Sequence, residues 1–588
     1  MQFVRKLLAK LAKFIIKCAP KKWVESLKQN PRLVAAYSNN LHKSGLMYQL
    51  QTLEELERSY ADYCVYQNAQ IQKLLQNESK QTGELTLVIC VVNFEATKLL
   101  ATLESVKNQH SAFSHLIFWC NRSEQVQLAD FLSVHLNQAY TLTINLNDDT
   151  KLTHIKNNPS FIIYAGDVLN YYAHFILSTQ IQLATQLAYV DTDVLDGDNK
   201  KGFPDFKPNW NPDLQLTAGY VNTGLWVDDL GRITSDCINL NLFSVSTYLC
   251  ESYLYNKNEI IQHISLVMVS CPQKKANLSD AKEQLKKMYH NFAEIIENNL
   301  PTVALRWHLK TNPLVSIIIP TRNSMDLVKE CIESILNRTT YTHYEILLID
   351  NGSDDAECIR YFKMLNEHPK ITLLTYNKPF NYSAINNFGA KHAKGEVLAL
   401  VNNDIEVISP DWLLDMVSHV MRNDIGCVGA KLLYGDNRIQ HAGVVMGYGG
   451  GAGHGHKYFP GDHLGYMNRL IASQNYSAVT AACLLVTTDD FWAVGGLNEE
   501  YLAVAFNDVD LCLKVQQLGR RNLYCAEAVL YHHESVSRGH ENTPEKVLRF
   551  NSELAYLQAT WSEAIDADPA YNPNLTLRRE NFSIKSFG

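Results

Sequence analysis

The sequence predicts an α/β protein that contains two copies of one unit and begins with a helical segment. Short apolar runs ending in polar turns alternate with amphipathic helical patterns, which is typical of strands buried on both faces and covered by helices. The order of run, turn, helix, run and turn begins at Leu85 and returns at Pro313. The polar turns repeat at one common offset, as Asn121 with Ser123 and as Asn351 with Ser353.

Length and composition support a globular protein of more than one domain. At 588 residues the chain is too long for a single hydrophobic core, and 46% of its residues are hydrophobic while 19% are charged. The net charge of -8 gives no global case for nucleic-acid binding, so we expect no nucleic-acid partner. The 13 cysteines show no paired C-x-x-C spacing, which favours free thiols in a reducing compartment.

Residues 1–81 are the predicted N-terminal helical segment, and the first of them are amphipathic and basic. Apolar residues recur at helical spacing, at Leu7, Leu8, Leu11, Phe14 and Ile15. Basic residues fill the other face, at Arg5, Lys6, Lys10, Lys13 and Lys17. No apolar run approaches the roughly 18–20 residues needed to span a bilayer. The pattern favours a helix lying on an anionic membrane surface, and a helix packed on its own protein is the alternative.

The two units follow, joined by a helical linker. The first unit is expected over residues 82–272 and the linker over residues 273–312, where "DAKEQLKKMYHNFAEIIENNL" (280–300) predicts a connecting helix. The second unit is expected over residues 313–588, with a C-terminal helical tail.

Three apolar runs of the second unit predict neighbouring parallel strands. "VSIIIP" (315–320), "EILLID" (345–350) and "VLALV" (397–401) are separated by helical patterns, over residues 326–337 and 383–393. Ligands of open α/β sheets bind at the carboxyl ends of the strands. Thr321, Asp350 and Asp404 fall at those ends, so the sequence predicts a binding site there.

Polar residues downstream add to this candidate site. Divalent cations prefer oxygen ligands, but one carboxylate with two amides, in "NND" (402–404), is a weak signal by itself. "FNDVDLC" places Asp508 and Asp510 near a predicted helix start, where helix capping is the alternative role. "LYHHESVSRG" offers His532, His533, Ser535 and Arg538, for which an ordinary surface pair of histidines is the alternative.

Residues 313–540 resemble the catalytic domain of family 2 glycosyltransferases, in particular the rhamnosyltransferase-like branch of O-antigen and capsule biosynthesis. The pieces that carry the resemblance are "VSIIIPTRN", "EILLIDNGSDD", "FNYSAINNFGAKHAKGEVLALVNND", "GAKLLYGDNRIQHAG", "AVTAACLLV", "FNDVDLCLK" and "YHHESVSRG". The first unit resembles the partner domain of tandem members through "YVDTDVLDGD" and "PDFKPNWNPDLQLTAGYV". The resemblance implies two tandem GT-A domains, a Rossmann-like fold of nucleotide-diphospho-sugar transferases.

The resemblance also implies roles for single residues on the donor side. Asp350 would bind the base and ribose of the nucleotide beside Thr321. Asp404 would hold Mg²⁺ or Mn²⁺ on the diphosphate, and His532 would be a further metal or phosphate ligand. Asn402 and Asn403 would complete the donor site, although the family often has a second acidic residue there.

On the acceptor side, the resemblance implies that Asp508 is the general base for an acceptor hydroxyl. One displacement at the anomeric carbon would then invert its configuration.

A glycine-rich stretch raises two rival interpretations. "GYGGGA" (447–452) matches a loose dinucleotide pattern, but the following "GHGHKYFPGDH" is no helix start, as that fingerprint requires. His454, His456 and His463 suggest a zinc site, although loop histidines without metal are commoner. A loop over the donor or the acceptor fits these residues better.

The first unit is predicted to be degenerate and inactive. In an alignment by motif order, Cys120 stands at the position of Asp350, and Ser244 and Ser246 stand near those of Asp508 and Asp510. Two counterparts remain, because Asp167 aligns with Asp404 and His263 with His532. A serine hydroxyl stays protonated near neutral pH and cannot replace an aspartate base. The remaining role of the first unit would be acceptor binding or support.

The expected function is inverting sugar transfer from a nucleotide-diphosphate sugar to a glycan acceptor, itself carried on a lipid, in bacterial surface-polysaccharide assembly. The expected location is cytoplasmic, peripheral on the inner face of the plasma membrane. Two alternatives remain, a bifunctional transferase with both units active and a nucleotide-sugar-binding pseudoenzyme that acts as a scaffold.

Overall fold

The computed structural model forms two compact units. The N-terminal unit comprises residues 53–305, 569–576 and 583–588, and the C-terminal unit includes residues 306–568 and 577–582. The structure describes residues 51–77, 83–136, 139–143, 158–195, 201–230, 260–272, 289–533 and 544–587, with isolated positions near residues 12–23 and 282–286. The predicted amphipathic face of residues 3–17, most of the linker helix, Ser244, Ser246, Ser535 and Arg538 lie outside these ranges.

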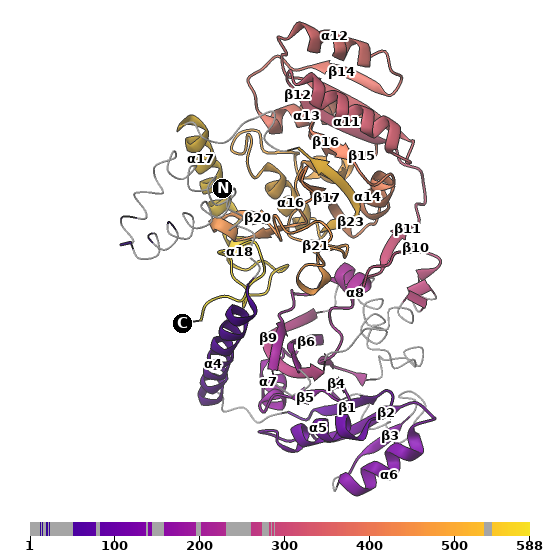
Figure 1. Ribbon diagram of the computed structural model, residues 1–588, viewed down its shortest axis with the longest axis vertical. Helices are drawn as coiled ribbons and strands as arrows, with labels where there is room; N and C mark the ends of the chain where they lie inside the picture. The colour runs from indigo at the N-terminus through magenta and orange to yellow at the C-terminus, as the bar shows by residue number, and fades with distance from the viewer. Residues whose placement is uncertain are drawn as a thin grey trace. The chain divides into compact units, whose positions relative to one another are not determined.

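The C-terminal unit is built on a ten-stranded sheet (Figure 1). The main strand order is β14-β13-β12-β15-β22-β17-β23-β16, with β18 paired to β17 and β21 paired to β23. The strands are β12 (Val315–Thr321), β13 (Tyr344–Asp350), β14 (Ile371–Thr375), β15 (Val397–Val401), β16 (Ile405–Val407), β17 (Ile425–Leu433), β18 (Ile439–His441), β21 (Gln474–Tyr476), β22 (Cys483–Thr487) and β23 (Arg521–His532).

Helices cover both faces of this sheet. The helices are α11 (Met325–Arg338), α12 (Ala356–Leu365), α13 (Tyr382–His392), α14 (Trp412–Val420), α15 (Thr488–Ala493), α16 (Asn507–Gln517), α17 (Pro544–Thr560) and α18 (Ser562–Asp566). Successive residues of β12 point to opposite faces, so Ile317 and Ile319 pack with α11, α12 and α14, while Ile318 packs with α13 and α16. The central strands are therefore buried on both sides, which explains their continuous apolar sequences.

Strand direction in this sheet is only partly as predicted. Strands β14, β13, β12 and β15 are parallel, as expected from the apolar runs and intervening helices. The sheet as a whole is mixed, because β22 runs antiparallel between β15 and β17. A strand buried on both faces has the same apolar sequence in either direction, so its composition does not reveal this reversal.

The N-terminal unit repeats the main strand order of this sheet, with no counterpart of β21 among its described strands, and this confirms the internal repeat. Its main order is β3-β2-β1-β4-β8-β6-β9-β5, with β7 paired to β6, and each neighbouring pair has the direction of its counterpart in the C-terminal unit. The strands are β1 (Thr86–Val91), β2 (His115–Cys120), β3 (Thr141–Thr143), β4 (Ser160–Tyr164), β5 (Val168–Leu169), β6 (Thr185–Leu195), β7 (Lys201–Asp205), β8 (Leu225–Val227) and β9 (Ile260–Pro272). The predicted α/β class with tandem units is thereby confirmed.

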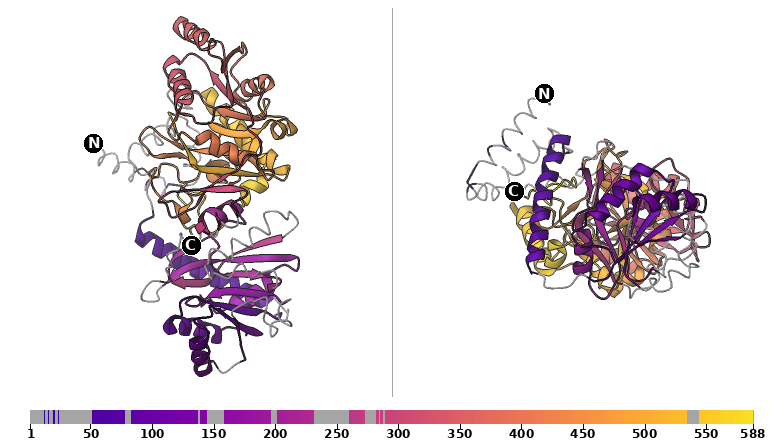
Figure 2. Two further views of the ribbon diagram at one scale, coloured as in Figure 1. Left: turned by 90° about the vertical axis from the view of Figure 1, so that its right-hand side faces the viewer. Right: turned by 90° about the horizontal axis from the view of Figure 1, so that it is seen from below.

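Helices and a short C-terminal chain segment complete the N-terminal unit (Figure 2). The helices are α4 (Leu53–Asn77), α5 (Ala96–Lys107), α6 (Gln125–His135), α7 (Ala173–Gln180) and α8 (Pro212–Ala218). The Asn572 Nδ2 atom donates to Asp191 Oδ2 at 2.9 Å and to the Lys207 carbonyl at 2.8 Å. Asn572, which follows the C-terminal sheet in the sequence, thus belongs to the core of the N-terminal unit.

The connecting helix predicted over residues 280–300 is wrong at its C-terminal end. The structure has strand β10 (Ala293–Ile296) there, paired with β11 (Ala304–Trp307) in a separate two-stranded sheet. The β-branched Ile295 and Ile296 favour strand, and the following Asn298, Asn299 and Pro301 favour a turn over continued helix.

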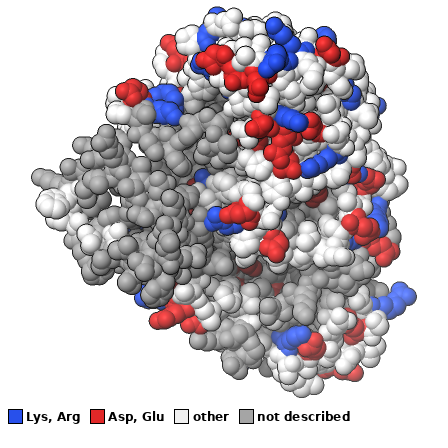
Figure 3. Space-filling view, turned by 45° about the horizontal axis from the view of Figure 1, so that its top comes forward, with Lys and Arg blue, Asp and Glu red and all other residues white. Residues whose placement is uncertain are grey.

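The distribution of surface charge and the hydrophobicity of the helices bear on binding to nucleic acid and to membranes. Acidic and basic side chains are interspersed on the described part of the face in Figure 3, without the continuous basic tract typical of nucleic-acid binding. Among the described residues, no helix combines the length and the hydrophobicity needed to cross a bilayer.

Candidate active site

The parallel strands bring the predicted donor-site residues to one edge of the C-terminal sheet. Thr321 and Asp350 end β12 and β13 and are register partners, and Asn402 directly follows β15. The Asn403 Nδ2 atom donates to Thr321 Oγ1 at 3.0 Å. The structure therefore joins the Asn-Asn-Asp segment to the end of β12, as the sequence predicted.

Asp350 is fixed by the turn that follows its strand. Its Oδ1 atom accepts hydrogen bonds from the Ser353 amide at 3.0 Å and from the Ser353 hydroxyl at 2.6 Å. Gly352 between them has a φ of 70°, which side-chain-bearing residues rarely adopt. Asn351 is buried and donates to the carbonyls of Tyr376 and Lys378, at 2.8 Å each. The turn holds the carboxylate at the strand end in one orientation.

Asp404 and His532 form a buried pair at the same edge. The side chains are 6% and 7% exposed, and Asp404 Oδ1 lies 3.2 Å from His532 Nε2. The antiparallel pairing of β16 with β23 creates this meeting, because Ile405 is the register partner of His532. The resemblance implied that both residues are metal ligands, but the sequence did not show that β16 and β23 are neighbouring strands.

The Asp404–His532 pair fits a divalent cation. Two ligands on one octahedral ion with bonds of about 2.1 Å lie about 3 Å apart, which matches the observed separation. The His532 Nδ1 atom is buried and has no hydrogen-bond partner among the residues that the structure describes. Asn402 Nδ2 lies 3.2 Å from His532 Nε2 and offers a further polar contact.

Asp508 lies in the first turn of α16, after Phe506 with a left-handed φ of 61°. Its Oδ2 atom accepts from the Thr480 hydroxyl at 3.0 Å and from the Ala481 amide at 2.9 Å, and its Oδ1 atom accepts from the Val509 amide at 2.9 Å. Burial raises the pKa of Asp508, and these hydrogen bonds oppose the increase. A raised pKa makes the carboxylate a stronger proton acceptor.

Asp510 has a different environment from Asp508 although it lies on the same helix turn. Asp510 is buried, pairs with Lys514 at 3.0 Å and accepts from the Trp561 indole at 2.9 Å. Neither aspartate is the N-cap residue, because Phe506 occupies that position. Asp508 nevertheless accepts from one first-turn amide, that of the next residue, whereas Asp510 attaches α16 to the segment before α18.

Sequence reasoning missed three residues that contact Asp508 or the segment that supports it. The Tyr382 hydroxyl lies 3.1 Å from Asn402 Oδ1 and 3.0 Å from the Ala481 carbonyl, so it contacts both the donor-side segment and the support of Asp508. Thr480 and His441 are the other two. All three lie inside the quoted motifs, but sequence periodicity gave no reason to separate them from core residues.

The glycine-rich stretch contains no dinucleotide site. Residues 447–452 lie at a hairpin of β19 (Val444–Met446) and β20 (Ala452–His454), and no α-helix follows. The three loop histidines have other partners. His454 stacks edge-on against His441, and His456 and His463 accept from the amides of Tyr466 and Gly465.

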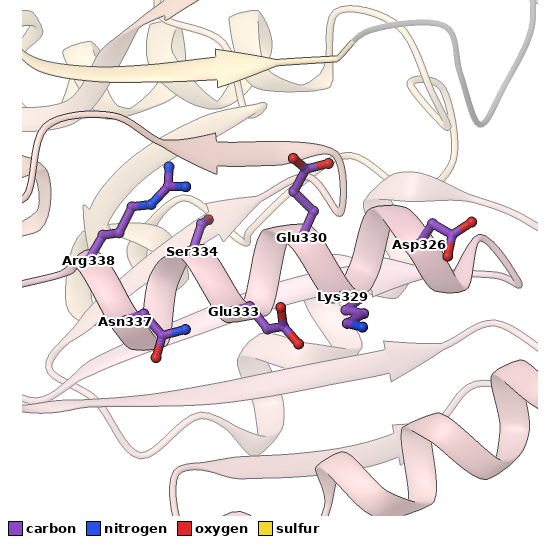
Figure 4. Close-up of a pocket in the computed structure, with 7 residues that line it drawn as sticks. All are labelled: Asp326, Lys329, Glu330, Glu333, Ser334, Asn337 and Arg338. Atoms are coloured by element: carbon purple, nitrogen blue, oxygen red, sulfur yellow. The ribbon is translucent and has the colours of Figure 1, made fainter.

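Another group of possible metal ligands among the described residues consists of Glu330, Glu406 and His533. Glu406 Oε2 lies 3.2 Å from His533 Nε2, and Arg338 donates to Glu406 Oε1 at 2.9 Å. Figure 4 shows Glu330 and Arg338 on one side of α11, in a shallow pocket of about 350 Å³. None of the residues that line this pocket is a predicted site residue.

In the N-terminal unit, the counterpart of Asp404 is sealed inside the protein. Asp167 is fully buried and accepts from the Tyr164 amide at 2.9 Å and from the Thr223 hydroxyl. It stabilises the turn after β4, the strand equivalent to β15.

The expected equivalence of His263 and His532 is wrong. The segment of β9 that pairs with β5 contains Val269 and Ser270, whereas His263 pairs with Tyr189 farther back along the strand. His263 Nε2 instead bonds to Asp191 Oδ1 at 2.8 Å. The alignment by motif order did not give the register of β9, which only the strand pairing shows.

Similarities to known proteins accord with this geometry. Residues 316–469 match the family model described as glycosyl transferase family 2. Over 540 residues the chain is 37% identical to the uncharacterized protein y4gI of Sinorhizobium fredii, which covers 86% of this chain and 59% of that protein. Over 430 residues it is 33% identical to the O-antigen biosynthesis protein RfbC of Myxococcus xanthus, which covers 70% of this chain and 33% of that protein. The chain thus spans less than two thirds of the length of both relatives.

Among solved structures, one similar protein is a mannosyltransferase from Pyrobaculum calidifontis in complex with GDP-mannose and Mn²⁺. It is 18% identical, the similarity covers 45% of this chain and 68% of that one, and the TM-score is 0.33.

Proposed function

Through residues 316–469 the chain belongs to the family 2 glycosyltransferases, and from this premise we propose that its C-terminal unit transfers a sugar from a nucleotide-diphosphate donor to a glycan hydroxyl. The reaction inverts the anomeric carbon. The observation that supports it best is the contact of Tyr382 with both Asn402 and Ala481, because Asn402 contacts His532 and the Ala481 amide donates to Asp508.

On the donor side, the residues at the strand ends bind and orient the nucleotide sugar. Asp350 and Thr321 bind the nucleoside, and Asn403 holds Thr321 in place. Asp404 and His532 would hold Mg²⁺ or Mn²⁺, which, when bound, neutralises the charge of the leaving diphosphate. The buried position of both ligands strengthens their interaction with charge at the diphosphate.

On the acceptor side, Asp508 is the general base. Its carboxylate accepts the proton of the acceptor hydroxyl while that oxygen forms a bond to the anomeric carbon. The bond from this carbon to the diphosphate oxygen breaks on the opposite face, so the electron pair leaves with the nucleotide. A single displacement of this kind inverts the centre. A base with three hydrogen bonds keeps one orientation during this step.

The N-terminal unit has a supporting or acceptor-binding role in this proposal. Its Asp167 is enclosed by the fold, and Ser270 stands near the position of the metal-binding histidine. The alternative with two active units would need a different ligand set there. The pseudoenzyme alternative is disfavoured by the joint presence of Asp404, Asp508 and His532 in the C-terminal unit.

The acceptor class and the location are proposals that the reaction and one relative support. The similarity to a protein of O-antigen biosynthesis supports surface-polysaccharide assembly, in which we propose a lipid-linked glycan acceptor. Such an acceptor suits an enzyme on the inner face of the plasma membrane, held there by the basic N-terminal segment.

A donor panel tests the proposal. Purified protein is incubated with nucleotide sugars, Mn²⁺ or Mg²⁺ and a short glycan acceptor, and released nucleoside diphosphate and extended glycan are measured. One donor should give acceptor-dependent release, and the new linkage should have the anomeric configuration opposite to that of the donor. A retained configuration, or no extension with any donor and acceptor, contradicts the proposal.

A further inference from the structure

His441 at the end of β18 has a defined hydrogen-bonding role. It is fully buried, with Nδ1 2.9 Å from the Ala430 carbonyl and Nε2 3.3 Å from the Thr480 amide. Only the neutral ring with its proton on Nδ1 satisfies both, donating to the carbonyl and accepting from the amide. Burial lowers the pKa of His441 to about 4, so the ring is neutral near pH 7.

The segment that His441 holds is the one that binds the proposed base. Thr480 and Ala481 lie between β21 and β22 and belong to neither strand. No sheet ladder fixes their direction, and the backbone–backbone bonds of this segment to described residues use the carbonyls of Thr480 and Ala482, so the Thr480 and Ala481 amides are held by side chains, His441 and Asp508. The Thr480 hydroxyl and the Ala481 amide are two of the three donors to Asp508. His441 is thus connected to the Asp508 carboxylate through one intervening residue.

We propose that His441 is a positioning residue for the transfer reaction, which sets the direction of the Asp508 carboxylate by holding Thr480. This inference rests on the proposed function, because Asp508 is the base only there. Its effect belongs to proton transfer from the acceptor, whereas donor binding depends on Asp350, Asp404 and His532. A displacement of about 1 Å at a reacting group can reduce the rate about 100-fold.

Two substitutions separate the contacts of His441. In His441→Gln, the side-chain carbonyl can reach the position of Nε2 and accept from the Thr480 amide, whereas in His441→Asn only the contact with Ala430 remains within reach. We expect His441→Asn to lower kcat about 10- to 100-fold and His441→Gln to stay within about 3-fold of the wild type. The KM for the nucleotide sugar should change less than about 2-fold in both.

Two substitutions of Thr480 form a second matched pair of variants, in which His441 is unchanged. Thr480→Ser keeps the hydroxyl donor to Asp508, and Thr480→Val removes it at nearly the same volume. Thr480→Val should lower kcat by a similar factor, and combining it with His441→Asn should cost less than the product of the two effects, because both act on Asp508 through Thr480. This pair also tests the proposal if His441→Asn fails to fold.

Hydrogen exchange provides a readout that needs no activity. The amides of residues 480–482 should exchange faster in His441→Asn than in the wild type or in His441→Gln, at unchanged unfolding temperature. If the wild type transfers no sugar, the proposed function fails, while this exchange difference still reports on the structural link. Equal kcat values for the wild type, His441→Asn and Thr480→Val, or a loss in His441→Gln equal to that in His441→Asn, would overturn the proposal.

Discussion

At the residue scale, Asp508 combines a raised pKa with three hydrogen bonds that hold its carboxylate. Asp508→Asn should abolish transfer, with a loss on the order of 10²–10⁴ in rate, because the amide cannot accept the proton. Donor binding, measured by calorimetry with the nucleotide sugar, should be nearly unchanged. Near-normal turnover in this variant would remove Asp508 from the mechanism.

The raised pKa of Asp508 also predicts how stability depends on pH. In the folded protein the carboxyl keeps its proton at a higher pH than in the unfolded chain. Between the two pKa values the folded state therefore binds more protons than the unfolded state. Its contribution to stability therefore falls as pH rises from the unfolded pKa through the folded pKa. Asp508→Asn, which stays neutral, should lose less stability than the wild type as pH rises from low values to pH 7, as measured by the unfolding temperatures of both proteins over that range.

The Asp404–His532 pair makes a separate prediction about the cation. EDTA should stop transfer, Mg²⁺ or Mn²⁺ should restore it, and Asp404→Ala should not be rescued by either ion, because one ligand of the buried pair is lost. Binding of Mn²⁺ to the wild type and to Asp404→Ala, followed by its paramagnetic signal, gives a second measurement. Full activity in EDTA would show that Asn402, Asn403 and Asp404 work without a metal.

At the element scale, α16 carries two aspartates with different tasks. Asp510→Asn weakens the contacts with Lys514 and Trp561 and should lower the free energy of unfolding by about 1–2 kcal/mol. Transfer should persist in this variant, measured at a temperature at which it is folded. A loss of transfer equal to that of Asp508→Asn, without loss of stability, would contradict this division.

The same scale shows how far sequence reasoning extends. The strands over residues 315–320, 345–350 and 397–401 were predictable because apolar runs ending in turn residues are typical of buried parallel strands. The position of Thr321, Asp350 and Asp404 at one edge of the sheet was also predictable, since the carboxyl ends of parallel strands meet there. The reversal of β22 was not predictable, and neither were the roles of Tyr382 and His441, because these depend on contacts between residues far apart in the chain.

At the scale of the whole molecule, the two matching sheets predict an unequal division of activity. Asp167→Asn keeps an oxygen to accept from Tyr164 and Thr223, so it should leave both the linkage and the rate almost unchanged. Asp404→Asn is the matched substitution in the C-terminal unit and should be inactive. Two linkages in the wild-type product, one lost with each substitution, would favour the bifunctional alternative.

The N-terminal segment makes a prediction about membrane binding. Deleting residues 1–22 removes five basic residues of the predicted helix, each contributing about 1 kcal/mol near an anionic surface. The truncated protein should no longer sediment with anionic vesicles, while transfer to a short water-soluble acceptor continues. Binding of the full chain should weaken as salt rises, because screening shortens the reach of these charges. Sedimentation of the truncated protein, or its unfolding, would instead assign the helix to the fold.

The bonds of Asn572 to Asp191 and to the Lys207 carbonyl have a consequence for how the chain is made. The ribosome synthesises the N-terminal sheet first, yet this asparagine emerges more than 300 residues after Lys207. At 5–20 residues per second the delay is on the order of tens of seconds. During that interval the nascent N-terminal unit lacks the Asn572 amide that donates to the buried Asp191 carboxylate, so this contact forms only after residues 306–568 have been synthesised.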